Sequence, residues 1–199
     1  MANSDDLIPI FQQSDNHLTI DALLALSRRR GVREIIEPQQ REEALERARL
    51  DEDIPEEKAL GLFLAGVRET FEEAGLLLAR RREESRFIDL TTDPEVARKF
   101  ATHREQLNKG DISLTQVLHD EDLVVPLDRL GYFAHWITPY IENKRFDTPF
   151  FVVTAPENQI PLHDDAETSD STWVSAQDAL AAYLDGELSL ALVVHQHLQ

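Results

Sequence analysis

Three glutamates at helical spacing, Glu69, Glu72 and Glu73, are the residues of this chain best suited to chemistry. At positions i, i+3 and i+4 of a helix they project from one face. Carboxylates crowded in this way repel each other unless a positive charge lies between them. A hard divalent cation such as Mg²⁺ is a good candidate, because it binds carboxylate oxygens and keeps water for substrate phosphates. Arg68, next to them, could orient one carboxylate through a bidentate ion pair.

Taken alone, three glutamates on an acidic helix are usually a solvated face. The full pattern of residues 68–75, R-E-x-x-E-E-x-G, is much rarer than that. Five fixed positions at background usages of roughly 5–10% each match on the order of once per million starting points. In this chain, a chance match is therefore on the order of one in several thousand. The spacing thus favours a metal-binding face over a chance cluster.

The element that must hold these residues is a helix that starts after Pro55, a residue well tolerated in a first helical turn. Apolar residues then recur every three or four positions, which predicts one buried face. Gly75 is a natural end for this helix. The residues of the predicted buried stripe are Leu60, Phe63, Leu64, Val67 and Phe71.

Further helices are predicted over Pro94–Leu107, Ser113–His119 and Ala176–Leu184, the last one capped by Ser175. Upstream, Met1–Gln13 is expected to be loose. A helix is predicted over Thr19–Leu26, with a hairpin of Leu23–Leu26 and Val32–Ile36 as the alternative.

Strands are predicted where β-branched and aromatic runs alternate with turn-forming residues. The run Phe150–Val153 is apolar on both faces, which predicts a central strand covered on both sides. Helices on either side of these strands predict an α/β (α+β) fold with a mixed sheet between helices. The predicted strands are Leu123–Leu127, Tyr132–Thr138, Phe150–Ala155 and Thr172–Val174.

The composition excludes several classes of protein. In 199 residues, 20 Lys and Arg face 38 Asp and Glu, a net charge of −18, which argues against binding to nucleic acid or anionic lipid. The absence of cysteine removes disulfides, thiolate catalysis and cysteine-ligated zinc. The first residues are acidic rather than basic and the apolar runs are short, so we expect a cytoplasmic protein without membrane association.

The segment from Arg68 resembles the second half of the Nudix box, G-x5-E-x7-R-E-U-x-E-E-x-G-U, where U is a bulky apolar residue. The resemblance continues to the C-terminus and is closest to the coenzyme A diphosphatase-like branch, which includes the peroxisomal enzyme and bacterial relatives. It implies a Nudix-like α/β/α sandwich. The further motifs that carry it, in order, are Ala134–Pro139, Arg145–Phe151, Glu167 with Ser171–Val174, and Gly186–Leu188.

This resemblance implies Mg²⁺- or Mn²⁺-dependent hydrolysis of the diphosphate bond in a small nucleoside diphosphate derivative, with coenzyme A or an acyl-CoA as the leading substrate. By position, Glu69, Glu72 and Glu73 would bind the metal ion. Glu69 would also be a candidate base toward water, and Arg68 would hold the carboxylate array.

Two later residues are weaker candidates. Arg145 could contact the substrate, although a structural ion pair with Asp147 is the alternative. Glu167 could be a late metal ligand or base, with a plain loop glutamate as the alternative.

The chain departs from the box in its first half, where the family's Gly and first Glu fall on Ile54 and Leu60. Thr70 stands at a usually apolar position, and no Gly-Gly turn occurs. These departures predict an atypical, helical or loosely ordered region over 1–54 and a Nudix-like domain over 55–199. They also predict a sheet that could lack its first strands. The alternative function is then a degenerate or truncated Nudix domain that binds a ligand or protein without catalysis, and its unpaired sheet edge would favour a homodimer.

Overall fold

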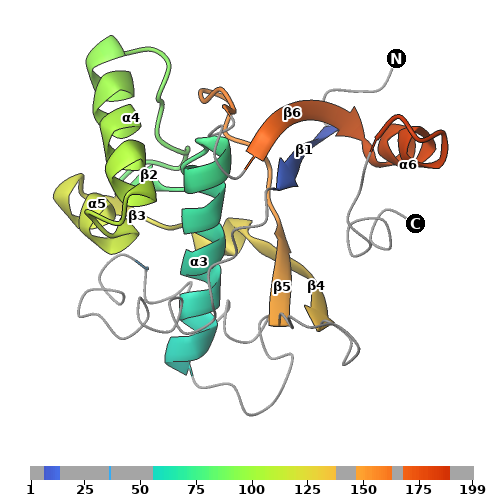
Figure 1. The fold of residues 1–199 in the computed structure, drawn as a ribbon. Coiled ribbons are helices and arrows are strands. Elements are labelled where there is room, and N and C mark those ends of the chain that lie inside the picture. The colour runs from blue at the N-terminus through green and yellow to red at the C-terminus, as the bar shows by residue number, and fades with distance from the viewer. Residues whose placement is uncertain (1–6, 14–35, 37–55, 138–146, 163–167, 189–199) are drawn as a thin grey trace. The chain divides into compact units, whose positions relative to one another are not determined.

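The computed structural model describes residues 7–13, 36, 56–137, 147–162 and 168–188 (Figure 1). The chain divides into two compact units. The larger unit is His17–Ile160, and the smaller one combines Met1–Asn16 with Pro161–Gln199.

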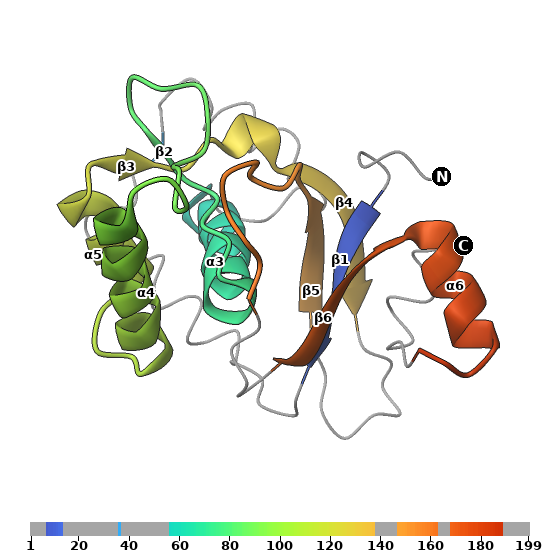
Figure 2. The same cartoon turned by 90° about the horizontal axis from the view of Figure 1, so that it is seen from above.

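The larger unit is built around one central helix. In two perpendicular views, α3 lies between α4 and α5 on one side and β4 and β5 on the other (Figures 1 and 2). The elements of this unit are α3 (Glu56–Ala74), β2 (Arg80–Arg81), α4 (Pro94–Asn108), α5 (Leu114–Asp120), β3 (Leu123–Val124), the 3-10 turn η2 (Leu127–Arg129), β4 (Gly131–Ile137) and β5 (Asp147–Val152).

The helix α3 confirms the predicted boundaries and buried stripe. It begins at Glu56 and ends at Ala74, and Gly75 follows with a left-handed φ of 70° that a residue without a Cβ adopts at no cost. The Gly75 N–H donates to the Phe71 carbonyl at 3.1 Å. All five predicted stripe residues are buried in the core of this unit.

α3 packs closely against β5. The rings of Phe63 and Phe151 lie 4.6 Å apart between centroids and are tilted by 39°. Gly66 makes this approach possible, because a Cβ at that position would lie 3.2 Å from Cδ2 of Phe151. The helix α3 is therefore fixed against the sheet pair through Phe63 and Gly66.

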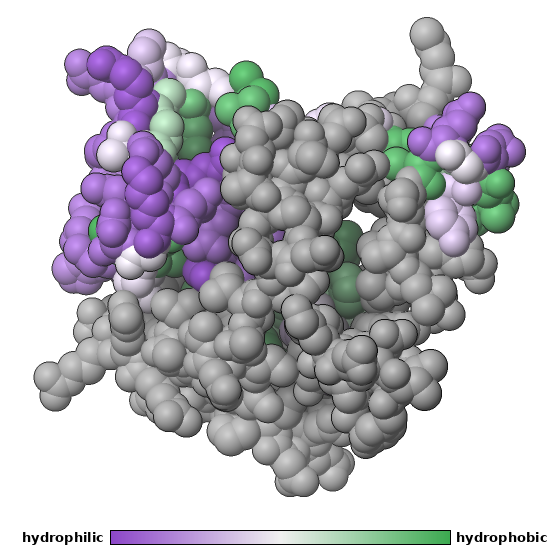
Figure 3. All heavy atoms as spheres, in the orientation of Figure 1, coloured by the Kyte–Doolittle hydropathy of each residue, from purple (hydrophilic) through white to green (hydrophobic). Residues whose placement is uncertain are grey.

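The helices α4 and α5 confirm two predictions to within one residue at each end. Asp93 caps α4 by accepting a hydrogen bond from the Glu95 amide at 2.8 Å. Ser113 caps α5 by accepting from the Gln116 amide at 3.2 Å. The visible surface over α4 is mainly hydrophilic (Figure 3), as expected for a helix that buries only one narrow side.

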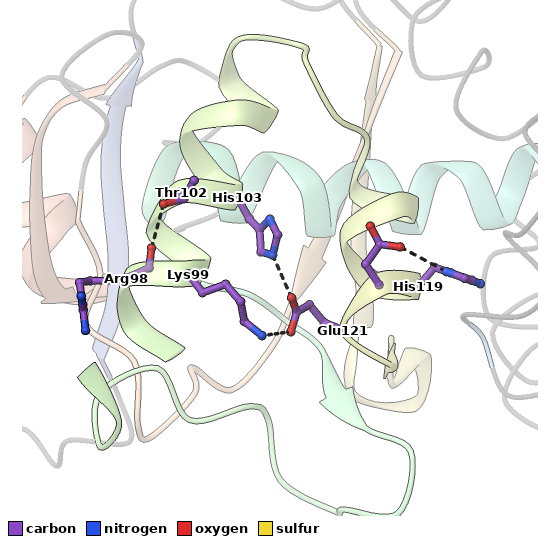
Figure 4. A network of polar contacts seen from close by, with 7 residues as sticks. Arg98, Lys99, Thr102, His103, His119 and Glu121 are labelled. Carbon is purple, nitrogen blue, oxygen red and sulfur yellow. Dashed lines mark hydrogen bonds and ion pairs between the residues drawn. The ribbon is translucent and has the colours of Figure 1, made fainter. Parts of the chain in front are cut away.

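A polar network joins α4 to the end of α5. The carboxylate of Glu121, 12% exposed, accepts hydrogen bonds from Lys99 Nζ and, at 3.0 Å, from His103 Nε2 (Figure 4). Burial alone would raise the pKa of Glu121, but the hydrogen bonds from Lys99 and His103 outweigh it and lower the pKa below its ordinary value. The His103 ring also packs edge-on against Phe100, with 5.5 Å between centroids.

The strands of the larger unit form two antiparallel pairs, β2 with β3 and β4 with β5. In the longer pair, Gly131 lies opposite Val152 and Ile137 opposite Asp147. The strand β5 starts and ends three residues earlier than the predicted strand Phe150–Ala155. The predicted strand Leu123–Leu127 is shortened to the two residues of β3, which precede the η2 turn.

The prediction that both faces of Phe150–Val153 are covered is wrong for Val152, which is 55% exposed. Among the described strands β5 pairs with β4 alone, and its contact with α3 is made through Phe151. An apolar run thus has one residue in the core and its neighbour in solvent, because successive side chains of a strand point to opposite faces.

A buried glutamine ties the segment after α3 to the segment after β5. The Gln159 side chain accepts from the Leu77 amide at 2.7 Å and donates to the carbonyls of Leu77 and Ile88 at 3.0 and 2.9 Å. Its amide group thus satisfies backbone groups that would otherwise be buried without partners.

The smaller unit contains a strand pair and a helix. β1 (Leu7–Gln13) runs antiparallel to β6 (Thr168–Ser175), with Leu7 opposite Ser175. The helix α6 (Ala176–Leu184) follows, capped by Ser175 as predicted. The expectation of a loose stretch over Met1–Gln13 is therefore wrong for residues 7–13, because a partner strand some 160 residues away orders them.

The mixture of helices and antiparallel strands confirms the predicted α+β class. The three strand pairs among the described residues are all antiparallel, so the parallel pair that a mixed sheet requires is not one of them. The predicted Thr19–Leu26 helix, its hairpin alternative and the boundary between residues 54 and 55 fall outside the described residues and stay predictions.

Candidate functional site

The last two turns of α3 carry the predicted site residues on one side of the helix. The guanidinium-bearing side chain of Arg68 is 10% exposed, and the side chains of Glu69 and Glu72 are 35% and 13% exposed. Glu73 is also only partly exposed. Because the apolar stripe faces the core, the four charged side chains lie where buried interior meets the surface.

Arg68 links two of the three glutamates. Its Nη2 forms a short ion pair with Glu69 Oε1, and its Nη1 lies 3.4 Å from both carboxylate oxygens of Glu72. The sequence predicted that Arg68 would hold one carboxylate. The structure places it between Glu69 and Glu72, two of the three members of the array that the resemblance implies.

Arg68 is a single cation shared by the carboxylates of Glu69 and Glu72. The Arg68 Nε is buried and has no hydrogen-bond partner among the described atoms, so Arg68 meets the carboxylates through its two terminal nitrogens. Neighbouring carboxylates of this kind are the ligands that a hard divalent cation prefers.

The donor chemistry of the cluster suits Mg²⁺ or Mn²⁺, which prefer carboxylate oxygens. Within the described residues, no three or more His, Cys, Asp or Glu side chains converge closely enough to hold a metal ion among them. Mg²⁺ does not need such a group, because it is often held by one or two carboxylates and completed by water and substrate phosphates. The glutamates of α3 fit this kind of partial site.

Thr70, which departs from the family pattern, is accommodated inside the helix. Its hydroxyl donates to the Gly66 carbonyl at 2.7 Å. A polar side chain bonded back to its own helix needs no partner elsewhere. The departure therefore leaves the course of α3 unchanged.

Two residues that the sequence did not indicate reach the site from α4. Arg104 donates to the backbone carbonyls of Glu72 and Glu73, and Asn108 donates to the Glu72 carbonyl at 3.5 Å. No local motif marks a side chain that binds the backbone of another helix. The sequence placed Arg104 within the predicted helix Pro94–Leu107 but gave no signal that this helix would lie against α3.

The two weaker candidates cannot be joined to this site from the described residues. Arg145 and Glu167 both fall outside the described ranges. Asp147, the alternative partner of Arg145, begins β5, and its side chain is also outside them. Both assignments stay predictions.

Comparison with known proteins gives a family and a fold. The model of the NUDT19 Nudix domain matches residues 8–195. A NUDIX hydrolase from Alicyclobacillus acidocaldarius has a similar structure, with a TM-score of 0.64 at 22% identity, over 100% of this chain and 84% of that one. At this identity the likeness shows the fold alone.

Two curated relatives carry the name acyl-coenzyme A diphosphatase NUDT19. The one from Xenopus laevis is 27% identical over 60% of this chain and 33% of its own length. The one from Homo sapiens is 28% identical over 69% of this chain and 37% of its own length. This chain therefore spans about a third of the curated relatives that it matches. The matches confirm the resemblance that the motifs predicted.

Within the described residues, no helix is long and apolar enough to cross a membrane.

Proposed function

Since the chain belongs to the NUDT19 Nudix domain family, we propose that it is a metal-dependent hydrolase of the diphosphate bond in a nucleoside diphosphate derivative, with coenzyme A or an acyl-CoA as substrate. The observation that carries this proposal is the cluster on α3, where Arg68 holds the carboxylates of Glu69 and Glu72 within the pattern R-E-x-x-E-E-x-G. The names of the relatives support the substrate class.

Glu69, Glu72 and Glu73 would hold the metal ion, Mg²⁺ or Mn²⁺. A bound divalent ion would offset the charge of the diphosphate and favour attack by water. This supply of positive charge matters in a chain of net charge −18, which otherwise repels an anionic substrate.

Individual residues of the chain would have separate roles in the reaction. Glu69, the more exposed of the two glutamates on Arg68, is the better placed to accept a proton from attacking water. Arg68 would orient the carboxylates of Glu69 and Glu72 from the buried side. Arg145 is proposed to contact the substrate and Glu167 to serve as a late metal ligand or base.

A hydrolysis assay tests the proposal. The purified chain is incubated with coenzyme A, acetyl-CoA, ADP-ribose or NADH in the presence of Mg²⁺ or Mn²⁺, and the products are separated by chromatography. We expect metal-dependent cleavage within the diphosphate, and a loss of about 100-fold or more in the Glu72→Gln variant.

The matched control is Glu105→Gln on α4, whose carboxylate pairs with Lys109 at the surface and should leave activity unchanged. Hydrolysis that persists in both Glu72→Gln and Glu73→Gln would contradict the assigned mechanism. A folded chain that cleaves none of the four compounds would contradict the proposed activity. It would also revive the non-catalytic alternative, which β1 and the family match do not favour.

A further inference from the structure

We propose that Arg104 of α4 is a positioning residue for the metal-binding glutamates of α3, an inference that rests on the proposed function of that site. It donates hydrogen bonds to the backbone from which Glu72 and Glu73 project. The divalent cation affinity of the site would then depend on a contact between two helices.

Arg104 contacts the end of α3 through two hydrogen bonds. Arg104 Nε donates to the Glu72 carbonyl at 3.0 Å, and its Nη2 donates to the Glu73 carbonyl at 2.9 Å. Asn108, one helical turn further along α4, adds a longer contact to the Glu72 carbonyl at 3.5 Å. The planar guanidinium thus bridges two consecutive peptide groups, which fixes their orientation more firmly than a single hydrogen bond would.

The usual donors to these carbonyls are engaged elsewhere. In a continuing helix, the amides of Leu76 and Leu77 would donate to the carbonyls of Glu72 and Glu73. Here the Leu76 amide donates to the Thr70 carbonyl at 3.4 Å, and the Leu77 amide donates to the Gln159 side chain at 2.7 Å. Arg104 takes the place of the missing helical donors.

The charge of Arg104 matches the place where it binds. The C-terminal end of a helix carries partial negative charge, and Glu72 and Glu73 add to it. The last turn of α3 contains no basic residue of its own. Arg104 therefore supplies from α4 the cation that many helices carry in their final turn.

The consequence for metal binding follows from geometry. Glu72 and Glu73 lie in the last turn of α3, where a helix frays most easily. Fraying would move both Cα–Cβ bonds, and carboxylates bind a metal ion tightly only when they are held in place. A clamp on the two peptide groups keeps the ligands in their binding positions before the ion arrives.

The test measures binding of Mn²⁺ alone, by electron paramagnetic resonance of the free ion, to the full chain and to Arg104→Gln. Arg104→Gln should weaken Mn²⁺ binding about 10-fold, the low end of the range for residues that support metal ligands. Arg104→Lys, which keeps the charge but loses the fork, should fall between wild type and Arg104→Gln. It also provides a second variant should Arg104→Gln not fold.

Arg98→Gln is the matched control, because the Arg98 side chain bonds back to the Pro94 carbonyl of its own helix at 3.1 Å. It should leave Mn²⁺ affinity unchanged. Thermal unfolding of each variant without metal separates positioning from plain stability. A lower melting temperature for Arg104→Gln and Arg104→Lys with unaltered Mn²⁺ affinity would overturn the inference. If Arg104→Gln loses Mn²⁺ affinity but the wild-type chain hydrolyses none of the tested compounds, the inference about Arg104 stands. The proposed activity is then refuted instead.

Discussion

Two clusters in the larger unit bring carboxylates and cations together, and they differ in the number of carboxylate and basic side chains that meet. In α3, the guanidinium of Arg68 is shared by two glutamates, Glu69 and Glu72. At the junction of α4 and α5, the single carboxylate of Glu121 has two partners, Lys99 and His103 (Figure 4).

Burial does not separate the two clusters. The Glu72 and Glu121 side chains are 13% and 12% exposed. What separates them is that the single carboxylate of Glu121 has two basic partners, whereas the single guanidinium of Arg68 has two carboxylate partners. We expect Glu121 to stabilise the fold, and we expect the glutamates of α3 to serve the proposed metal ion. The two clusters should therefore respond in opposite ways to the same chemical change, a glutamate replaced by glutamine.

The largest effect is expected from Glu73→Gln. The hydrolysis rate should fall about 100-fold or more, because a proposed metal ligand is lost. The melting temperature should stay the same or rise slightly, because a negative charge is removed from the negative end of a helix. Parallel measurements of hydrolysis and thermal unfolding check both parts. A clear fall in melting temperature would show that the α3 cluster is a structural element like Glu121.

Gln159→Leu gives a reference in which no charge changes. The variant removes three buried hydrogen bonds of the Gln159 side chain. They join it to the Leu77 amide and to the carbonyls of Leu77 and Ile88. We expect a loss of about 2 kcal/mol in the free energy of unfolding. Urea titration measures it. A loss below experimental error would mean that water replaces the amide at this position.

Glu121→Gln should show the reverse of Glu73→Gln. The free energy of unfolding should fall by about 1 kcal/mol, because Lys99 and His103 lose a charged partner that holds α4 to the end of α5. Hydrolysis at saturating metal ion should stay close to that of the wild type. A large loss of activity with unchanged stability would erase the distinction between the two clusters.

The smallest effect concerns pH. Because the pKa of Glu121 is lowered below its ordinary value of 4.5 in the folded chain, its contribution to stability is present above about pH 4.5 and is lost as the pH falls further. The stability difference between wild type and Glu121→Gln should therefore shrink below pH 4.5. Urea titrations between pH 7 and pH 3 would reveal it. A difference that stays constant over that range would contradict the assigned charge on Glu121.

The helices could be predicted closely because their boundaries depend on neighbouring residues. Asp93, Ser113 and Ser175 each cap a helix through a hydrogen bond to an amide two or three residues away. Strands depend on partners that are distant in sequence, so their limits were predicted less well. β1 was missed altogether, since Pro9 weakens the strand signal and its partner β6 lies near the other end of the chain.

For the site, the sequence by itself determined that Arg68, Glu69, Glu72 and Glu73 share one part of a helix, because helical periodicity is a local property. It also indicated the family through the spacing of those residues. Only the tertiary structure decided that Arg68 holds two of the glutamates from a buried position. It also decided that Arg104 reaches their backbone across about 30 residues and that Gln159 bonds to Leu77 across 82 residues. Contacts of that range exist only after the chain has packed its helices and strands together, and the amino-acid pattern near each partner carries no sign of them.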